Sequence, residues 1–200
     1  PEMRRRVFRE ARAASSVLHP NVIRIHEIVT TEAGAPALVM DLLRGESLAS
    51  FLAREQTLGL SELADIFLQV VAAVRAAHAA GVVHRDLKPA NVFLADVVGG
   101  PRAVRVLDFG IAKVVTKGAA GATELTRTGH TVGTVQYMAP EQIFGEGELD
   151  ARVDVWSLGV MMYECLVGRR PVEGGNAAQI ARALTKSKIV PIAQLRPHLP

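Results

Sequence analysis

The sequence feature that most constrains the fold is a polar segment, residues 84–91 (HRDLKPAN), which lies between a helical pattern and a hairpin pattern. Over residues 61–80, apolar side chains recur at the i, i+3, i+4 spacing of a core-facing helix, and Gly81 follows directly as a helix-ending residue. The short apolar runs 92–94 and 104–107 flank a Gly-Gly-Pro turn, which predicts a β-hairpin. The predicted apolar stripe of the helix consists of Leu63, Ile66, Phe67, Val70, Val71 and Val74.

The rest of the chain adds both helices and strands. Asp154 is placed to cap a helix that is apolar on nearly every face, and Gly168 is placed to close it. Residues 111–138 are rich in Thr and Gly and predict a long loop, and loops of this length in compact domains are usually functional. The predicted elements outside the central segment are a helix over 4–18, strands over 22–29 and 37–40, a short helix over 47–54, a buried helix over 154–167 and an amphipathic helix over 177–185.

Composition excludes several classes of protein. Lys and Arg number 23 against 20 Asp and Glu, and a net charge of +3 is too small to be a footprint for nucleic-acid binding. A single cysteine, Cys165, excludes an internal disulfide framework and favours a reducing, cytoplasmic setting. The longest apolar stretch is interrupted by polar residues, so no membrane span is expected. Because the first residue is Pro1 and not Met, we interpret the chain as part of a longer protein, in which a membrane anchor beyond residue 200 is left open.

Three short motifs carry the chemistry. Residues 84–91 match all five specified positions of the catalytic-loop pattern H-R-D-L-x-x-x-N, which chance produces in on the order of one in 10⁴ chains of this length. Asp108-Phe109-Gly110 follows the second strand of the predicted hairpin, and Ala139-Pro140-Glu141 closes the long loop. Each motif stands in the order and the local structure that its function requires.

On these motifs the chain resembles the eukaryote-type (Hanks-type) bacterial Ser/Thr protein kinases over essentially all of its length. The resemblance implies an α+β, two-lobed fold, with a partial N-lobe over 1–40, a hinge over 41–47 and a mostly helical C-lobe over 48–200. No lysine precedes Lys88 and no G-x-G-x-x-G loop is present, so we expect a fragment that lacks part of its N-lobe and is inactive alone. By the same resemblance the C-lobe lacks its last helices.

The resemblance implies phosphoryl transfer from ATP, in which catalysis consists mostly of positioning and electrostatics. Asp86 would orient the substrate hydroxyl and accept its proton, and Lys88 would contact the γ-phosphate and indicates Ser/Thr substrates. Asn91 and Asp108 offer oxygen ligands that suit Mg²⁺, with Mn²⁺ as the alternative cation. His84 is expected to pack in the core and bond to the backbone, without acid–base chemistry.

Further ATP contacts follow from the resemblance. Glu10 matches the helix residue that pairs with the ATP-binding lysine of the family. Met40 would be the gatekeeper of the adenine site, and the backbone groups of Asp41 and Leu43 would meet the adenine.

The long loop is expected to regulate activity. Thr126 and Thr128 are spaced like the activation threonines of bacterial Ser/Thr kinases. Arg85, expected in a partly enclosed cleft, would pair with a phosphothreonine there. Asp154 matches a buried aspartate that steadies the catalytic loop in this family.

Two other functions are weighed against a protein kinase. A pseudokinase or docking module has no physical need for Asp86, Asn91 and Asp108 together. A small-molecule phosphotransferase of the aminoglycoside-kinase type shares an Asp…Asn…Asp arrangement, but the Ala-Pro-Glu end of the loop favours protein substrates. The expected partners are therefore proteins with Ser or Thr acceptors and a second copy of the kinase for autophosphorylation, without nucleic acid.

Overall fold

A computed structural model describes residues 16–32, 36–109, 135–145, 147, 149–174, 176–186 and 189–199. Most of the helix predicted over 4–18 lies outside the described residues, as do Glu10, Thr126 and Thr128. Residues 16–18 are described and are not helical, so the prediction that the helix extends to residue 18 is wrong. A turn leads from there into the first strand, across His19-Pro20.

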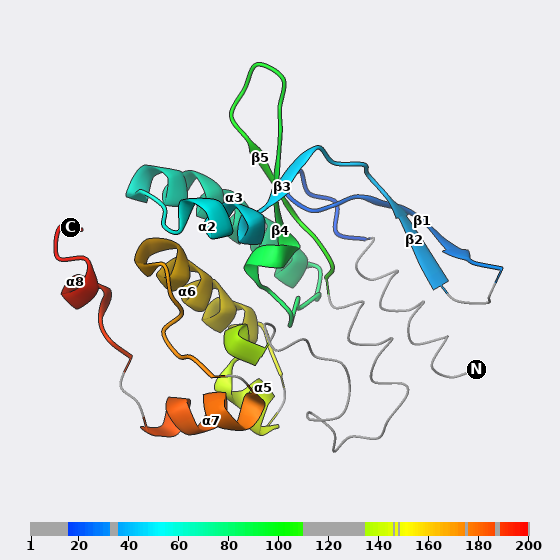
Figure 1. Ribbon diagram of the computed structural model, residues 1–200. Coiled ribbons are helices and arrows are strands. Elements are labelled where there is room, and N and C mark those ends of the chain that lie inside the picture. Colours follow the sequence, from blue (N-terminus) through cyan, green and yellow to red (C-terminus); the bar gives the residue numbers. More distant parts are fainter. Residues whose placement is uncertain are drawn as a thin grey trace.

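The described strands form two small antiparallel sheets (Figure 1). Strands β1 (Ile25–Thr30) and β2 (Pro36–Met40) form one sheet. Strands β3 (Gly45–Ser47), β4 (Val92–Ala95) and β5 (Ala103–Val106) form the other, in the order β3-β4-β5. The predicted strand pair and the predicted β4–β5 hairpin are confirmed, whereas β3 was not predicted.

Strand β3 depends on one glycine. Gly45 has φ of +131° and pairs with Ala95, and a Cβ at this position would lie 2.1 Å from the carbonyl oxygen of Leu94. No side chain fits at that distance, so only glycine allows β3 to approach β4 this closely. The segment after β2 is thereby fixed against the hairpin.

Helices make up most of the rest, and the predicted helices within the described residues are confirmed. Figure 1 shows α6 between the α2–α3 pair on one side and α5 and α7 on the other. The helices are α2 (Leu48–Glu55), α3 (Leu60–Ala79), α5 (Pro140–Phe144), α6 (Arg152–Val167), α7 (Ala177–Lys186) and α8 (Ile192–Leu195), with 3₁₀ turns η1 (Pro89–Asn91) and η2 (Val135–Tyr137).

The buried face of α3 agrees with the predicted apolar stripe except at one position. Leu63, Ile66, Phe67 and Val70 are buried, but Val71 is 45% exposed. The face is completed by small side chains instead, because Ala73 and Ala77 are fully buried. Alanines let a neighbouring element approach closely, and an apolar count alone does not distinguish them from exposed alanines.

Helix α6 corrects one prediction and confirms another. Ala151, and not Asp154, is the N-cap, and Asp154 is fully buried within the first turn. Gly168 closes the helix with a left-handed φ of 80°, as predicted. The Asp154 carboxylate is therefore available to other elements, which it serves at the site described below.

The core lies between the helices and the β4–β5 hairpin. Leu48, Leu87, Leu94 and Met161 are among its fully buried side chains, and they come from four different parts of the chain. Burying each such side chain stabilises the fold by about 1.5–3 kcal/mol. The segment 84–91 is thus anchored in this core by its own Leu87 and by Leu94 of the strand that follows it.

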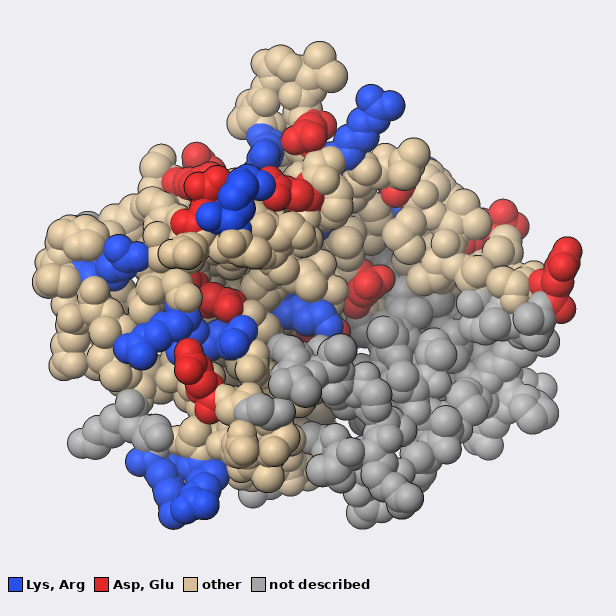
Figure 2. All heavy atoms as spheres, viewed as in Figure 1, with Lys and Arg blue, Asp and Glu red and all other residues tan. Residues whose placement is uncertain are grey.

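The surface gives two further observations. Figure 2 shows Lys and Arg interspersed with Asp and Glu over the described part of the face in view. Among the described residues, no helix has the length and apolar character needed to cross a membrane.

Candidate active site

The structure brings three predicted site residues together in the loop between α3 and β4. Lys88 Nζ lies 3.0 Å from Asp86 Oδ2. Asn91 Nδ2 donates to the backbone oxygen of Asp86 at 2.9 Å and lies 3.4 Å from its Oδ2. The Asp86 carboxylate is thus oriented by a cation and an amide that follow it within five residues.

The Asp86–Lys88 pair is mostly removed from solvent. The side chain of Asp86 is 13% exposed and that of Lys88 is 22% exposed. Charge–charge interactions are stronger here than at a fully exposed surface, because fewer water molecules screen them. The pair keeps a carboxylate that can accept a proton close to a cation that can stabilise negative charge.

Asp154 holds the backbone of this loop through hydrogen bonds. Its Oδ2 accepts the backbone N–H of His84 at 2.8 Å, and its Oδ1 accepts that of Arg85 at 2.8 Å. His78 Nε2 also lies 2.7 Å from Oδ2. A buried carboxylate is costly unless it is fully hydrogen-bonded, and here three donors from two elements meet that need. The predicted steadying role of Asp154 agrees with these contacts.

His84 is fully buried and uses both ring nitrogens. Nε2 lies 2.8 Å from the carbonyl oxygen of Leu107, and the N–H of Asp86 donates to Nδ1 at 3.3 Å. Burial lowers the pKa of His84, and the negative charge of Asp154 opposes that shift only in part. The contacts fit a neutral ring with its proton on Nε2, packed 4.8 Å from the Phe109 ring. The expectation that His84 packs and bonds to the backbone agrees with this geometry.

Asp108 follows directly after the hairpin and next to the catalytic loop. The N–H of Leu107 donates to the carbonyl oxygen of Asn91 at 2.8 Å, which joins the end of the hairpin to the loop. Asp108 itself is exposed and has a left-handed φ of 56°. Within the described part of the chain, Arg85 and Asp108 are two of the three non-glycine residues with positive φ. Such backbone concentrates at functional sites.

Comparisons with known proteins identify the family of this chain. The family profile described as Protein kinase domain matches residues 1–198. The chain belongs to the protein kinase domain family. Its relatives include serine/threonine-protein kinase pkn3 of Myxococcus xanthus, 39% identical over 192 residues, which are 96% of this chain and 35% of that protein. Serine/threonine-protein kinase PknA of Mycobacterium tuberculosis is 39% identical over 204 residues, covering 100% of this chain and 44% of that protein.

The fold of the kinase domain is matched as well. The solved structure of the Mycobacterium tuberculosis PknI kinase domain superposes with a TM-score of 0.69 at 26% identity, covering 99% of this chain and 66% of that chain. The relatives are bacterial Ser/Thr protein kinases, as the sequence motifs predicted. This chain spans less than half the length of each of the two relatives named above.

The segment expected to form the kinase hinge continues the pairing of β1 with β2. The N–H of Asp41 donates to the carbonyl oxygen of Arg24 at 3.1 Å. Because this N–H already has a partner, the backbone group of Asp41 that can bond to a ligand is its carbonyl oxygen. The β1–β2 register shifts at His26, and His26 Nε2 lies 2.7 Å from Asp41 Oδ1. The side chain of Met40 is 38% exposed, and Leu43 is half-buried.

The donor set at Asn91 and Asp108 fits a hard cation that shares its ligands with a substrate. Among the residues that the structure describes, no group of three or more His, Cys, Asp or Glu side chains could hold a metal ion. Asn91 donates through Nδ2 to Asp86, which leaves its amide oxygen as the acceptor atom, and Asp108 adds a carboxylate. Mg²⁺ is usually held by one or two such oxygens together with phosphates and water.

The structure corrects the environment expected for Arg85. Its side chain is exposed and does not lie in a partly enclosed cleft, and its Nη2 donates to the carbonyl oxygen of Leu149 at 3.3 Å. Burial therefore gives no argument that Arg85 requires an anion. A role for Arg85 with Thr126 or Thr128 rests on the resemblance alone, because both threonines lie outside the described residues.

His78 is a site residue that the sequence analysis did not predict. It lies in the last turn of α3, where a histidine is commonly explained by the helix dipole. Its contact with Asp154 joins residues 76 positions apart, and no local pattern predicts such a pair. The available signal was the position of His78 six residues before the catalytic-loop motif.

Proposed function

We propose that the protein containing this chain is an ATP-dependent protein Ser/Thr kinase, which transfers the γ-phosphoryl group of Mg·ATP to Ser and Thr hydroxyls of proteins. The observation that carries the proposal is the arrangement of Lys88 and Asn91 around Asp86, on a loop fixed by Asp154. Family membership supports the reaction class.

The roles follow from charge and position. Asp86 orients the acceptor hydroxyl and takes its proton, because its carboxylate is the acceptor at the centre of the loop. Lys88, 3.0 Å from that carboxylate, contacts the γ-phosphate and offsets the negative charge on its oxygens. Neither role requires a covalent intermediate, so positioning accounts for most of the rate enhancement.

ATP and its cation complete the site. Asn91 and Asp108 would hold Mg²⁺, or Mn²⁺ in its place, and such a cation would neutralise charge on the phosphates. Met40 lines the adenine site as gatekeeper, and the backbone groups of Asp41 and Leu43 bond to the adenine. Glu10, outside the described residues, would pair with an ATP-binding lysine that the 200 residues do not contain before Lys88.

The same proposal assigns the parts of the domain. Residues 1–40 belong to a truncated N-lobe, in which the resemblance places the helix that carries Glu10 ahead of strands β1 and β2. Residues 41–47 belong to the hinge and 48–200 to a C-lobe without its last helices. The coverage of the relatives supports a fragment, because the match spans 66% of the PknI kinase domain chain. A cytoplasmic location of this domain remains a prediction from its single cysteine.

One assay separates the proposed function from its alternatives. The intact protein is incubated with labelled ATP, a divalent cation and three acceptors: itself, a general protein substrate and an aminoglycoside. We expect label on phosphoserine and phosphothreonine of protein, and loss of labelling when the cation is chelated. Label on the aminoglycoside alone would indicate a small-molecule phosphotransferase, and no transfer at all would indicate a pseudokinase.

The isolated 200-residue chain provides the matched comparison in that assay. We expect its transfer rate to be far below that of the intact protein, because the lysine and glycine-rich loop that hold the β- and γ-phosphates in this family are not within it. Equal rates for the two proteins would contradict the assignment of the chain as a fragment that is inactive alone.

A further inference from the structure

Gln142 joins helix α5 to the catalytic loop. Its side chain is 8% exposed, and both ends of its amide are used. Nε2 donates to the carbonyl oxygen of Arg85 at 3.0 Å, and Oε1 accepts the N–H of Ala139 at 3.1 Å. The two partners fix the orientation of the amide, because one offers only an acceptor and the other only a donor.

The Oε1 contact is a local helix cap. Gln142 is the third residue of α5 and reaches back to the N-cap residue Ala139, as Glu or Gln commonly does at this position. The Nε2 contact is different, because it crosses 57 residues of sequence to reach the loop that carries Asp86. A helix cap alone gives no reason for this second contact.

The peptide unit between Arg85 and Asp86 is held at both ends. Its carbonyl oxygen accepts from Gln142, and its N–H donates to Nδ1 of His84. Arg85 has a left-handed φ of 63°, a conformation that L-residues disfavour, and its own N–H is held by Asp154. The peptide plane that precedes the Cα of Asp86 is therefore fixed in part by contacts from outside the loop. One of these contacts comes from α5.

We propose that Gln142 is a positioning residue for Asp86, and that the seating of α5 on the catalytic loop controls the orientation of the Asp86 carboxylate. This inference rests on the proposed function, in which Asp86 orients the acceptor hydroxyl. It makes the start of α5, which follows η2 and the buried Ala139, part of the apparatus that aligns the catalytic loop.

Gln142→Glu is the discriminating variant. A glutamate caps the helix as well as a glutamine, so α5 and its contact with Ala139 are retained. Once ionised, the glutamate offers no donor to the Arg85 carbonyl, so the variants are compared at a pH of about 8, where that contact is lost. Gln142→Leu removes both contacts, and Tyr163→Phe serves as a control, because it removes a partly buried hydrogen bond to the carbonyl of Val190 elsewhere in the fold.

The variants are compared in the intact protein by steady-state kinetics and by hydrogen exchange of the peptide covering 84–88. For Gln142→Glu we expect kcat to fall about tenfold, with KM for ATP within about twofold of the wild-type value, because the nucleotide contacts are unchanged. Exchange of the 84–88 amides should be faster than in the wild type. Gln142→Leu should show both effects, and Tyr163→Phe neither.

The two readouts keep this inference apart from the proposed function. If the wild-type protein transfers no phosphate, the proposed function fails, and faster exchange at 84–88 in Gln142→Glu still supports the structural coupling. Wild-type exchange and wild-type kcat in Gln142→Glu would overturn the proposal. A rise in KM for ATP without a fall in kcat would also overturn it, as would equal effects in Tyr163→Phe.

Discussion

At Arg85 and Asp108 the backbone is left-handed, with φ of 63° and 56°. A non-glycine residue in this region costs on the order of 1 kcal/mol or more relative to an ordinary conformation. At Arg85 the surroundings hold it in place, because Asp154 accepts its N–H and Gln142 donates to its carbonyl. Much of the buried polar chemistry at this site therefore serves to hold the backbone around Asp86.

His84 predicts a dependence of stability on pH. Burial lowers the pKa of His84 in the folded protein below the ordinary value of 6.5, so between these two pKa values the unfolded chain binds a proton that the folded protein does not. The stabilisation is complete above pH 6.5 and is lost as the pH falls, by up to about 1.4 kcal/mol per pH unit.

The test compares wild type with His84→Leu by chemical unfolding between about pH 7.5 and about pH 5.5. We expect the wild type to lose more stability than the variant on acidification, so that the difference in unfolding free energy between them narrows. A difference that stays constant over this range would contradict the prediction, because it would show that His84 binds its proton equally in the folded and unfolded states.

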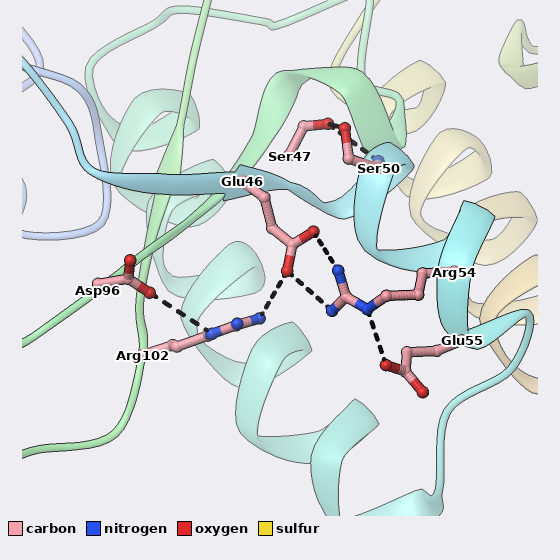
Figure 3. Close-up of polar contacts among 7 residues, drawn as sticks. All are labelled: Glu46, Ser47, Ser50, Arg54, Glu55, Asp96 and Arg102. Carbon is pink, nitrogen blue, oxygen red and sulfur yellow. Dashed lines mark hydrogen bonds and ion pairs between the residues drawn. The ribbon is translucent and has the colours of Figure 1, made fainter.

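At the scale of elements, a cluster of charged side chains joins β3, α2 and the loop of the β4–β5 hairpin (Figure 3). Glu46 accepts hydrogen bonds from both terminal nitrogens of Arg54, at 2.9 and 3.0 Å, and from one nitrogen of Arg102 at 3.2 Å. Both guanidinium groups also lie over the ring of Phe51, at 5.2 and 5.3 Å from its centroid. The cluster reinforces β3 where Gly45 brings it against β4.

Arg54→Leu should lower the unfolding midpoint by a small amount, because exposed ion pairs are individually weak even in a network. The loss should shrink in about 1 M NaCl, where charges are strongly screened. Hydrogen bonding to Arg54 lowers the pKa of Glu46 from 4.5, so the contribution is complete above pH 4.5 and is lost on further acidification. Arg169→Leu, at an exposed arginine outside the cluster, is the control. An equal effect in both variants would contradict the account.

The long loop carries the regulatory prediction. We expect autophosphorylation of the intact protein at Thr126 and Thr128, and lower activity in the Thr126→Ala/Thr128→Ala double variant, because a phosphate of about −2 charge can pair with an arginine and order the loop. Mass spectrometry after incubation with Mg·ATP identifies the modified residues. Unmodified threonines in an active enzyme, or full activity in the double variant, would contradict this prediction.

Local sequence patterns predicted most of the helices and strands. The features that they did not predict depend on contacts between residues distant in sequence. The helix at α3 and the β4–β5 hairpin were evident from their periodicity and turn residues. Strand β3 has three residues, too few for an alternating pattern, and exists because β4 pairs with it. Asp154 precedes an apolar run like a helix cap, whereas its burial follows from partners about 70 residues away.

At the scale of the whole molecule, the chain belongs to the protein kinase domain family, and its described residues place Asp86, Lys88 and Asn91 together and Asp108 next to them. The three motifs predicted these site residues, because the residues of each motif lie close together in the sequence. The sequence did not predict the supports of the loop, since His78 and Gln142 reach it only through the tertiary fold.

Under the proposed function, Asp86 acts on the acceptor hydroxyl and Asp108 on Mg·ATP. The most direct measurement is the ATP affinity and kcat of Asp86→Asn and Asp108→Asn in the intact protein. We predict that Asp86→Asn lowers kcat by about 100-fold or more with nearly unchanged ATP affinity. Asp108→Asn should weaken Mg·ATP binding by about tenfold or more, because an amide is a poorer ligand for a hard cation. Near-wild-type kcat and ATP affinity in both variants would contradict the account.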